Sequence, residues 1–253
     1  MKKKNILPVL CTILMAVGAV PANAGNIDEA GTIQYLQPAR SFAAGTGTEE
    51  DPYQISNAAE LALMAGQITD EEDIYGKEYE TACYVLTEDI VLNDFGDRKE
   101  GDAYEGEYSW KPADNVMYTG TFDGNGHSIR GMYIHTEAED IYYSYGLFGQ
   151  INGTVKNLTV SDSYIAVSGL NVSVGGIVGS GVFLTAESDA VPGNAPPEEA
   201  VLILRGCKNS GKLWMAEETE YENYDGEQLY KNYLGEIIGN WCGEDEYSVF
   251  VDE

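Results

Sequence analysis

Short apolar runs separated by glycine and asparagine turns dominate the chain from Tyr118 to Val160, with no helical spacing among them. The runs are rich in β-branched and aromatic residues, which predicts short strands. Asp123-Gly124-Asn125-Gly126 predicts a tight turn, because Gly and Asn tolerate positive φ. Similar runs predict strands at 84–92, with a kink near Glu88-Asp89, and at 128–134, 164–167, 174–179, 201–204, 212–215 and 247–251. The pattern favours an all-β protein.

One element of this pattern recurs at a fixed interval. Gly146-Leu147-Phe148-Gly149 returns as Gly176-Ile177-Val178-Gly179 and as Glu236-Ile237-Ile238-Gly239. The closing glycines are 30 and then 60 residues apart, and periods of this size indicate stacked structural repeats. A β-sandwich would need longer strands at wider spacing with hairpin signals. Short strands, corner turns and a long period therefore predict a parallel β-helix.

A single convincing helix precedes these repeats. Asn57 is a suitable N-cap and Glu60 completes a capping box. Leu61, Met64, Ala65 and Ile68 then follow helical spacing, which places one apolar stripe on a short helix. Stacked coils need a terminal cap, because their open end exposes backbone groups and core. Residues 42–68 are therefore predicted to form an N-terminal capping element.

The first 24 residues have the pattern of a secretory signal peptide. Lys2, Lys3 and Lys4 precede an apolar stretch that ends in Ala22-Asn23-Ala24. The stretch is shorter than the ~20 apolar residues of a spanning helix. The expected organisation is a signal peptide at 1–24, an arm at 25–41, the cap and first strands at 42–117, and coils with acidic insertions at 118–253. Residues 93–109 are expected to form an exposed charged loop.

Composition restricts the class of partner. The 253 residues include 14 Lys and Arg against 42 Asp and Glu, for a net charge of −28. Removing Lys2–Lys4 leaves 11 Lys and Arg and a charge of −31. Such a surface repels nucleic acid and anionic lipid. With 18 Tyr, 6 Phe and 3 Trp the chain is expected to fold.

Cysteine number and spacing predict neither a disulfide framework nor a zinc site. Three cysteines remain after signal cleavage: Cys83, Cys207 and Cys242. The odd number argues against a framework, and the default interpretation is a small apolar side chain. A pairing of Cys207 with Cys242 is left open.

The repeated element resembles the GLUG motif of bacterial secreted and surface proteins. Other segments occur in the same order in such proteins: 45–55, Leu86-Thr87-Glu88-Asp89-Ile90, Trp110-Lys111-Pro112 and 120–129. The resemblance covers roughly residues 42–239, and Glu236 departs from it where Gly is usual. It implies a right-handed parallel β-helix of the pectate-lyase-like type. Members include adhesin-like proteins and the N-terminal repeat regions of IgA-specific metallo-endopeptidases. The resemblance implies architecture rather than catalysis, with structural glycines at Gly146, Gly149, Gly176, Gly179 and Gly239.

Two groups of residues are candidates for ligand chemistry. Asp123 and Asn125 could bind a cation, with Ca²⁺ the candidate, although a turn explains both neighbouring glycines better. Tyr142, Tyr143, Tyr145 and Tyr224 lie in or beside predicted excursions from the coils, where they could stack on sugars or contact a protein. Their alternative role is to shield coil edges.

No catalytic residue or cofactor is predicted. The chain has no H-E-x-x-H motif, and its carboxylates do not recur at matching positions of neighbouring coils. The expected function is a secreted or cell-surface, non-catalytic β-helix module for adhesion, or for binding a glycan or protein. A carbohydrate-active β-helix enzyme (a polysaccharide lyase or glycoside hydrolase) and a fragment of a larger surface protein are the alternatives. Ligand identity and oligomeric state stay open.

Overall fold

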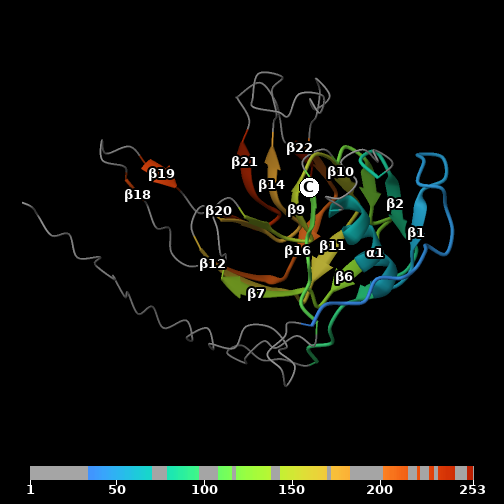
Figure 1. The fold of residues 1–253 in the computed structure, drawn as a ribbon, viewed down its shortest axis with the longest axis horizontal. Coiled ribbons are helices and arrows are strands. Elements are labelled where there is room, and N and C mark those ends of the chain that lie inside the picture. Colours follow the sequence, from blue (N-terminus) through green and yellow to red (C-terminus); the bar gives the residue numbers. More distant parts are fainter. Residues whose placement is uncertain are drawn as a thin grey trace, which may run out of the picture.

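Strands joined by parallel pairings are the main regular elements of the protein in the computed structural model (Figure 1). The structure describes residues 34–69, 79–96, 108–115, 118–137, 143–169, 172–182, 202–215, 221–222, 228–230, 233–242 and 250–252. Within these ranges there is one helix, and the strand pairs are parallel except for β18 (Tyr221–Glu222) with β19 (Gln228–Tyr230). The predicted all-β class is confirmed. The predicted signal peptide lies outside the described residues.

The strands assemble into five main sheets. The largest is ordered β1 (Tyr53–Ile55), β2 (Cys83–Leu86), β5 (Thr121–Asp123), β10 (Gly153–Lys156), β15 (Leu202–Arg205) and β22 (Phe250–Asp252). The second is β3 (Ile90–Val91), β6 (Ser128–Arg130), β11 (Thr159–Ser161) and β16 (Lys208–Asn209), and the third is β7 (Tyr133–Glu137), β12 (Tyr164–Ser168) and β17 (Lys212–Met215). The fourth is β8 (Ser144–Tyr145), β13 (Ser173–Gly175) and β20 (Tyr233–Gly235), and the fifth is β4 (Ala113–Asn115), β9 (Phe148–Ile151), β14 (Val178–Val182) and β21 (Ile238–Cys242).

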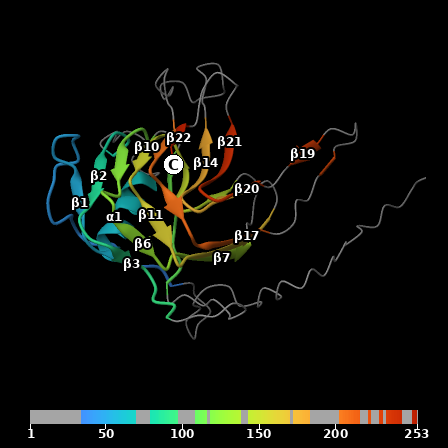
Figure 2. The same ribbon diagram turned by 180° about the vertical axis from the view of Figure 1, so that it is seen from behind.

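The chain visits these sheets in the same order on each pass. One pass runs β5 to β9, the next runs β10 to β14, and each strand pairs with its counterpart in the previous pass. Phe148 lies opposite Val178, which lies opposite Ile238, so the register follows the interval of 30 and then 60 residues. Early strands β1 and β2 lie at one end beside the helix, and β21 lies at the other (Figures 1 and 2).

The repeated glycines fall in one column of the fifth sheet. Because Val178 and Ser180 pair with Phe148 and Gln150 on one side, Gly179 stands opposite Gly149. On the other side the same two residues pair with Ile238 and Asn240, which places Gly239 next in the column. A Cβ at Gly179 would lie 2.5 Å from the Tyr145 backbone nitrogen, and one at Gly239 would lie 2.6 Å from the Gly179 carbonyl oxygen. Any larger residue at either position would have to displace backbone.

The core is the stack of inward side chains between the sheets. Tyr84, Phe122, Val155 and Leu204 occupy one register column, and each is at most 1% exposed. Phe122 meets Phe148 of the fifth sheet edge to face, with ring centroids 5.4 Å apart. In β2, β5, β10, β11 and β15 buried residues alternate with more exposed ones, which explains why runs of three or four residues suffice to bury an apolar column.

Helix α1 (Ala58–Thr69) packs on this core beside β4, the edge strand of the fifth sheet. The predicted apolar stripe is confirmed, since Leu61, Met64, Ala65 and Ile68 are all at most 5% exposed. The Asn57 side-chain oxygen accepts a hydrogen bond from the Glu60 backbone N–H at 3.0 Å, as an N-cap should. The capping box itself differs from the prediction: Glu60 accepts from the backbone N–H of Ser56, one residue before the cap.

Of three local predictions, one is confirmed and two are wrong. The predicted kink near Glu88-Asp89 is confirmed, since β2 and β3 are separate strands. The single strand predicted at 128–134 is wrong: Gly131, at φ +76°, turns the chain between β6 and β7. The prediction of an exposed loop at 93–109 is also wrong for Asn93 and Phe95, which are 6% and 5% exposed. The Asn93 side chain donates to the carbonyls of Tyr108 and Gly131, and this buried amide holds the base of the loop.

Candidate functional site

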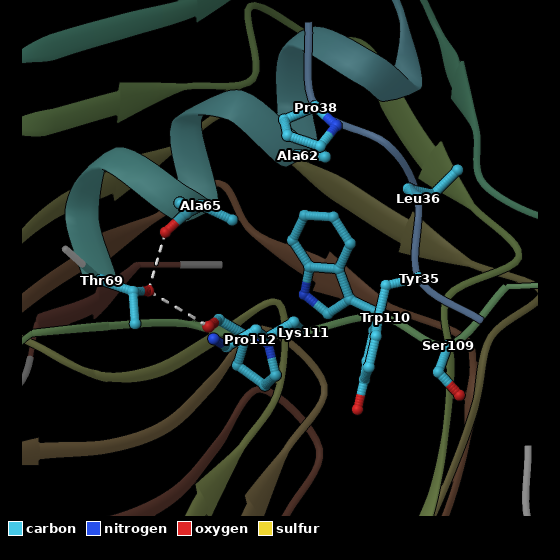
Figure 3. A pocket seen from close by; sticks show the side chains of 11 residues that line it. Tyr35, Leu36, Pro38, Ala62, Ala65, Thr69, Ser109, Trp110, Lys111 and Pro112 are labelled. Carbon is cyan, nitrogen blue, oxygen red and sulfur yellow. Dashed lines mark hydrogen bonds between the residues drawn. The ribbon is translucent and has the colours of Figure 1, made fainter. Parts of the chain in front are cut away.

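A groove begins between α1 and the N-terminal arm (Figure 3) and continues over β7 and β8. Its first part is a cavity of about 450 Å³. The arm supplies Tyr35, Leu36 and Pro38; α1 supplies Ala62, Ala65, Gly66 and Thr69; and the segment Ser109–Pro112 closes the remaining side. Three segments that are distant in the sequence thus form one concave surface.

A second cavity of about 370 Å³ continues the first. The two share Tyr35, Thr69 and Ser109–Pro112 as lining residues, so they are parts of one groove. The second part extends over β7 and β8, where it is lined by Asp114, Ile134, His135, Thr136, Tyr143, Ser144 and Tyr145. We refer to the two cavities together as the aromatic groove.

Backbone hydrogen bonds hold the walls of the aromatic groove. Tyr35 forms a parallel bridge with Ser109, whose N–H donates to the Gln34 carbonyl at 2.9 Å. The Trp110 N–H donates to the Tyr133 carbonyl at 2.7 Å, and its indole Nε1–H donates to the Leu147 carbonyl at 3.0 Å. Both N–H groups of Trp110 therefore donate hydrogen bonds within the fold, and these bonds fix the ring in the wall of the groove.

Thr69 joins the helix to the opposite wall. Its hydroxyl donates to the Ala65 carbonyl at 2.7 Å (Figure 3). It also accepts from the Asp114 backbone N–H at 3.0 Å. The Asp114 carboxylate in turn accepts from the Gln150 N–H at 3.0 Å. These bonds connect the end of α1 to β4 and β9, so the groove has a rigid floor.

Two of the predicted tyrosines meet in the second part of the groove. The rings of Tyr143 and Tyr145 have centroids 6.2 Å apart, and Tyr143 is 42% exposed. Burial raises the pKa of Tyr145 to about 12, with smaller contributions from nearby Tyr143, Tyr35 and Asp114. Its phenol is therefore a neutral hydrogen-bonding group at ordinary pH. Tyr142 and Tyr224, the other two predicted residues, lie outside the described residues.

His135 adds a further polar aromatic side chain. Its Nδ1 lies 3.3 Å from the Tyr133 hydroxyl, and its ring packs edge to face on Tyr133 and Tyr164. Burial lowers the pKa of His135, which favours the neutral imidazole. Tyr35, Trp110 and His135 were not predicted as site residues, because nothing in their local sequence indicates that they meet Tyr145.

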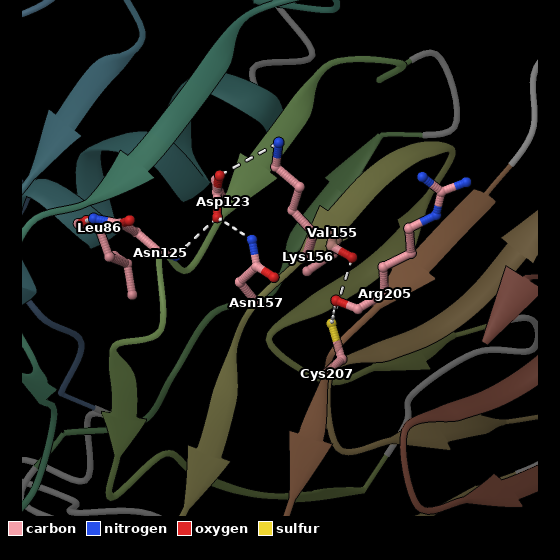
Figure 4. A network of polar contacts seen from close by, with 8 residues as sticks. All are labelled: Leu86, Asp123, Asn125, Val155, Lys156, Asn157, Arg205 and Cys207. Atoms are coloured by element: carbon pink, nitrogen blue, oxygen red, sulfur yellow. Dashed lines mark hydrogen bonds and ion pairs between the residues drawn. The ribbon is translucent and has the colours of Figure 1, made fainter. Parts of the chain in front are cut away.

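The predicted cation-binding residues belong to a different part of the molecule, a corner of the coils (Figure 4). One carboxylate oxygen of Asp123 accepts from the Asn125 N–H at 2.8 Å and from the Asn157 side-chain amide at 3.0 Å. The other lies 3.3 Å from the Lys156 ammonium nitrogen. Asn125 and Asn157 adopt φ of +52° and +53°, so these contacts are those of a turn. Among the described residues no three His, Cys, Asp or Glu side chains are grouped to hold a metal, and cation binding by Asp123 and Asn125 stays a prediction.

Cys207 lies beside this corner as a free thiol. It is 5% exposed, and its Sγ lies 3.4 Å from the Val155 carbonyl oxygen. Burial raises the pKa of this thiol. Cys83 is also free and half-buried, while the side chain of Cys242 lies outside the described residues. For Cys207 the predicted role of a small buried side chain is confirmed.

No protein-family model matches the chain. It is 32% identical over 141 residues to the "Putative Gly-rich membrane protein" of Evansella cellulosilytica, which corresponds to 55% of this chain and 14% of that protein. It is 27% identical over 139 residues to the Halomucin of Haloquadratum walsbyi, which corresponds to 54% of this chain and 1% of that protein. The chain therefore spans a small part of the length of either relative.

A solved structure shares part of the arrangement of the chain. The crystal structure of a "putative immunoglobulin A1 protease" from Bacteroides ovatus superposes with a TM-score of 0.46 at 19% identity, covering 80% of this chain and 56% of that one. In the part of the chain that the structure describes, no helix has the length and apolar character needed to span a bilayer.

Proposed function

We propose that this protein is a secreted or cell-surface, non-catalytic module that binds a glycan in the aromatic groove. The module is a right-handed parallel β-helix whose first coil is capped by α1. Support for the architecture comes from the constant order in which the chain visits five sheets and from the in-register parallel pairing between passes. Support for export comes from the signal-peptide pattern of residues 1–24.

The aromatic groove is the observation that carries the proposal. Sugar rings present apolar C–H faces and hydroxyl edges, so they suit aromatic side chains that also carry polar groups. Tyr35 and Tyr143, which are 45% and 42% exposed, offer such side chains to solvent, and Tyr145 lies beside them. Binding sites combine a largely apolar concave surface with a few oriented polar groups. Ser109, Thr136 and His135 supply those groups here.

The charged groups of the groove favour binding over hydrolysis. Glycosidases place two carboxyl groups about 5–9.5 Å apart on either side of the scissile bond. Among the described lining residues Asp114 is the one carboxylate, and it already accepts a backbone hydrogen bond from Gln150. A carbohydrate-active enzyme is the second candidate, and the experiment below includes its test.

The decisive measurement is binding to a glycan array by the wild type and by the double variant Tyr143→Ser/Tyr145→Ser. We expect the double variant to lose at least about tenfold in affinity, or about 1.4 kcal/mol, because both ring faces are removed. Val91→Ser is the matched control, since Val91 is 46% exposed on β3 and does not line the groove. Its binding should equal that of the wild type.

Three outcomes would contradict the proposal. Unchanged binding by the double variant would exclude the aromatic groove as the glycan site. Release of soluble sugar from a polysaccharide by the wild type, with or without Ca²⁺, would show an enzyme. If the double variant abolished binding to an extracellular protein rather than to glycans, the groove would be a protein-binding surface. The predicted alternative of a fragment of a longer surface protein is tested separately, by reading the gene beyond the codon for Glu253.

A further inference from the structure

The groove consists of two connected cavities, each large enough for a small ligand by itself. Each of its two cavities, about 450 and 370 Å³, falls within the ~300–1,000 Å³ that a single small-molecule site occupies. Six shared lining residues make them continuous, with Trp110 and Tyr35 at the junction. Exposed Tyr143 and half-buried Tyr145 lie at one end, and the small residues of α1 lie at the other. A ligand that filled both parts would be a chain of several units.

Gly66 is an unexplained residue in the wall of the first cavity. It lies inside α1, where glycine costs about 0.5–1 kcal/mol relative to alanine. A Cβ at Gly146 or Gly239 of the repeat would meet backbone atoms, but one at Gly66 would meet no atom of the described residues within 4 Å. Its φ is not in the left-handed region, so helix geometry does not require it. Packing among the described residues therefore gives no reason for glycine here, whereas a ligand lying against α1 would.

The charge of the groove restricts the chemistry of that ligand. The charged lining side chains are Lys111, in both cavities, and Asp114, in the second. The groove thus has little net charge of its own, and Tyr145 and His135 are held in their neutral forms. The whole chain carries −28, which repels polyanions at long range. An uncharged ligand fits this setting better than an acidic one.

We propose that the aromatic groove binds an extended, uncharged oligosaccharide, with one part against Tyr143 and Tyr145 and the next part against Tyr35 and the Ala62–Gly66 face of α1. The proposal rests on the glycan-binding function proposed above and adds the length and charge of the glycan. Trp110, which is 4% exposed, forms part of the wall between the two parts (Figure 3), and its backbone and indole N–H groups both donate hydrogen bonds within the fold.

The test is calorimetric titration with neutral gluco-, manno- and xylo-oligosaccharides of increasing length, and with oligogalacturonates of the same lengths. For the wild type we expect at least tenfold tighter binding of a neutral oligosaccharide than of its monosaccharide. Gly66→Leu places a side chain in the first cavity, and should remove most of that gain while leaving binding of the shortest sugars unchanged. Tyr143→Ser should weaken binding at every length. Gly66→Ala, which fills less of the cavity, should give a smaller loss.

Each alternative result has a distinct meaning. Equal affinity for the monosaccharide and the longer oligomers would overturn the extended site but leave glycan binding intact. So would unchanged long-oligomer binding by Gly66→Leu. Tighter binding of oligogalacturonates than of neutral oligosaccharides at moderate salt would overturn the proposal that the ligand is uncharged. Absence of binding to any glycan would overturn the proposed function itself.

Discussion

At the scale of the residue, the repeated glycines act through the backbone that surrounds them. Gly149, Gly179 and Gly239 stand next to one another across β9, β14 and β21, where successive passes of the chain come closest to the fourth sheet. The neighbours of Gly179 are backbone atoms of Ser144 and Tyr145, which cannot rotate away as a side chain could. Tyr145 belongs to the aromatic groove, so this glycine also affects the position of a site residue.

Gly179→Ala should therefore destabilise the protein. A Cβ 2.5 Å from the Tyr145 nitrogen overpacks the interior, which typically costs about 1–3 kcal/mol. For a protein of this size each kcal/mol lowers the melting temperature by roughly 2–4 °C. Thermal unfolding followed by circular dichroism measures the change.

Gly66→Ala is the matched control for that substitution. It makes the same chemical change at a site with open space, and should stabilise the protein by about 0.5–1 kcal/mol through helix propensity. Equal melting temperatures for the two variants would show that the glycine column does not depend on close packing.

At the scale of the element, one carboxylate connects α1 to the segments that precede it. Glu60 is 5% exposed and accepts hydrogen bonds from the N–H of Ala43 at 3.0 Å and from the N–H and hydroxyl of Ser56 at 2.8 and 2.9 Å. Its negative charge also lies in the first turn, where the helix dipole favours an anion. The helix and the chain before β1 are therefore held as one unit.

Glu60→Gln should lower the free energy of unfolding while leaving the fold unchanged. An amide has one accepting oxygen, so at least one of the three donors would face an NH₂ group in a largely buried place. Leaving a buried donor unsatisfied costs about 1–3 kcal/mol. Urea denaturation should show that loss, whereas Glu49→Gln, at an exposed position, should stay within about 0.5 kcal/mol of the wild type. Equal midpoints for both variants would show that these hydrogen bonds do not hold the helix in place.

At the scale of the whole molecule, the surplus of carboxylates opposes folding. A chain with 42 acidic and 14 basic residues concentrates negative charge when it compacts, and self-repulsion destabilises the compact state. Some of the few cations are used locally, as when Lys156 pairs with Asp123 at the coil corner. Screening should therefore stabilise this protein more than it would a neutral one.

We expect the melting temperature to rise when NaCl is raised from about 0.01 to 0.15 M, which shortens the Debye length from about 30 to 8 Å. A gain of the order of 1 kcal/mol would appear as roughly 2–4 °C. KCl should act like NaCl, and Mg²⁺ like Ca²⁺ at equal ionic strength. A larger rise with Ca²⁺ that Asp123→Ala abolished would instead support the predicted cation site. A fall in melting temperature with NaCl would contradict the role of self-repulsion.

The sequence alone determined the class of fold, the helix with its buried stripe, and the interval of the glycine column. These features depend on local spacing: alternation sets the inward face of a strand, and a fixed period sets which residues stack. The predictions of a single strand through Gly131 and of an exposed Asn93 were wrong. A corner and a buried amide depend on partners from other passes of the chain.

Only the tertiary structure shows which residues form the aromatic groove. Tyr143 and Tyr145 were predicted from their clustering, but Tyr35, Trp110 and His135 join them through a bridge to Ser109 and through strand stacking. Tyr35 and Tyr145 are far apart in the chain and have no shared motif. Their proximity results from the path of the arm across α1 and the pairing of one pass on the next, which no local pattern encodes.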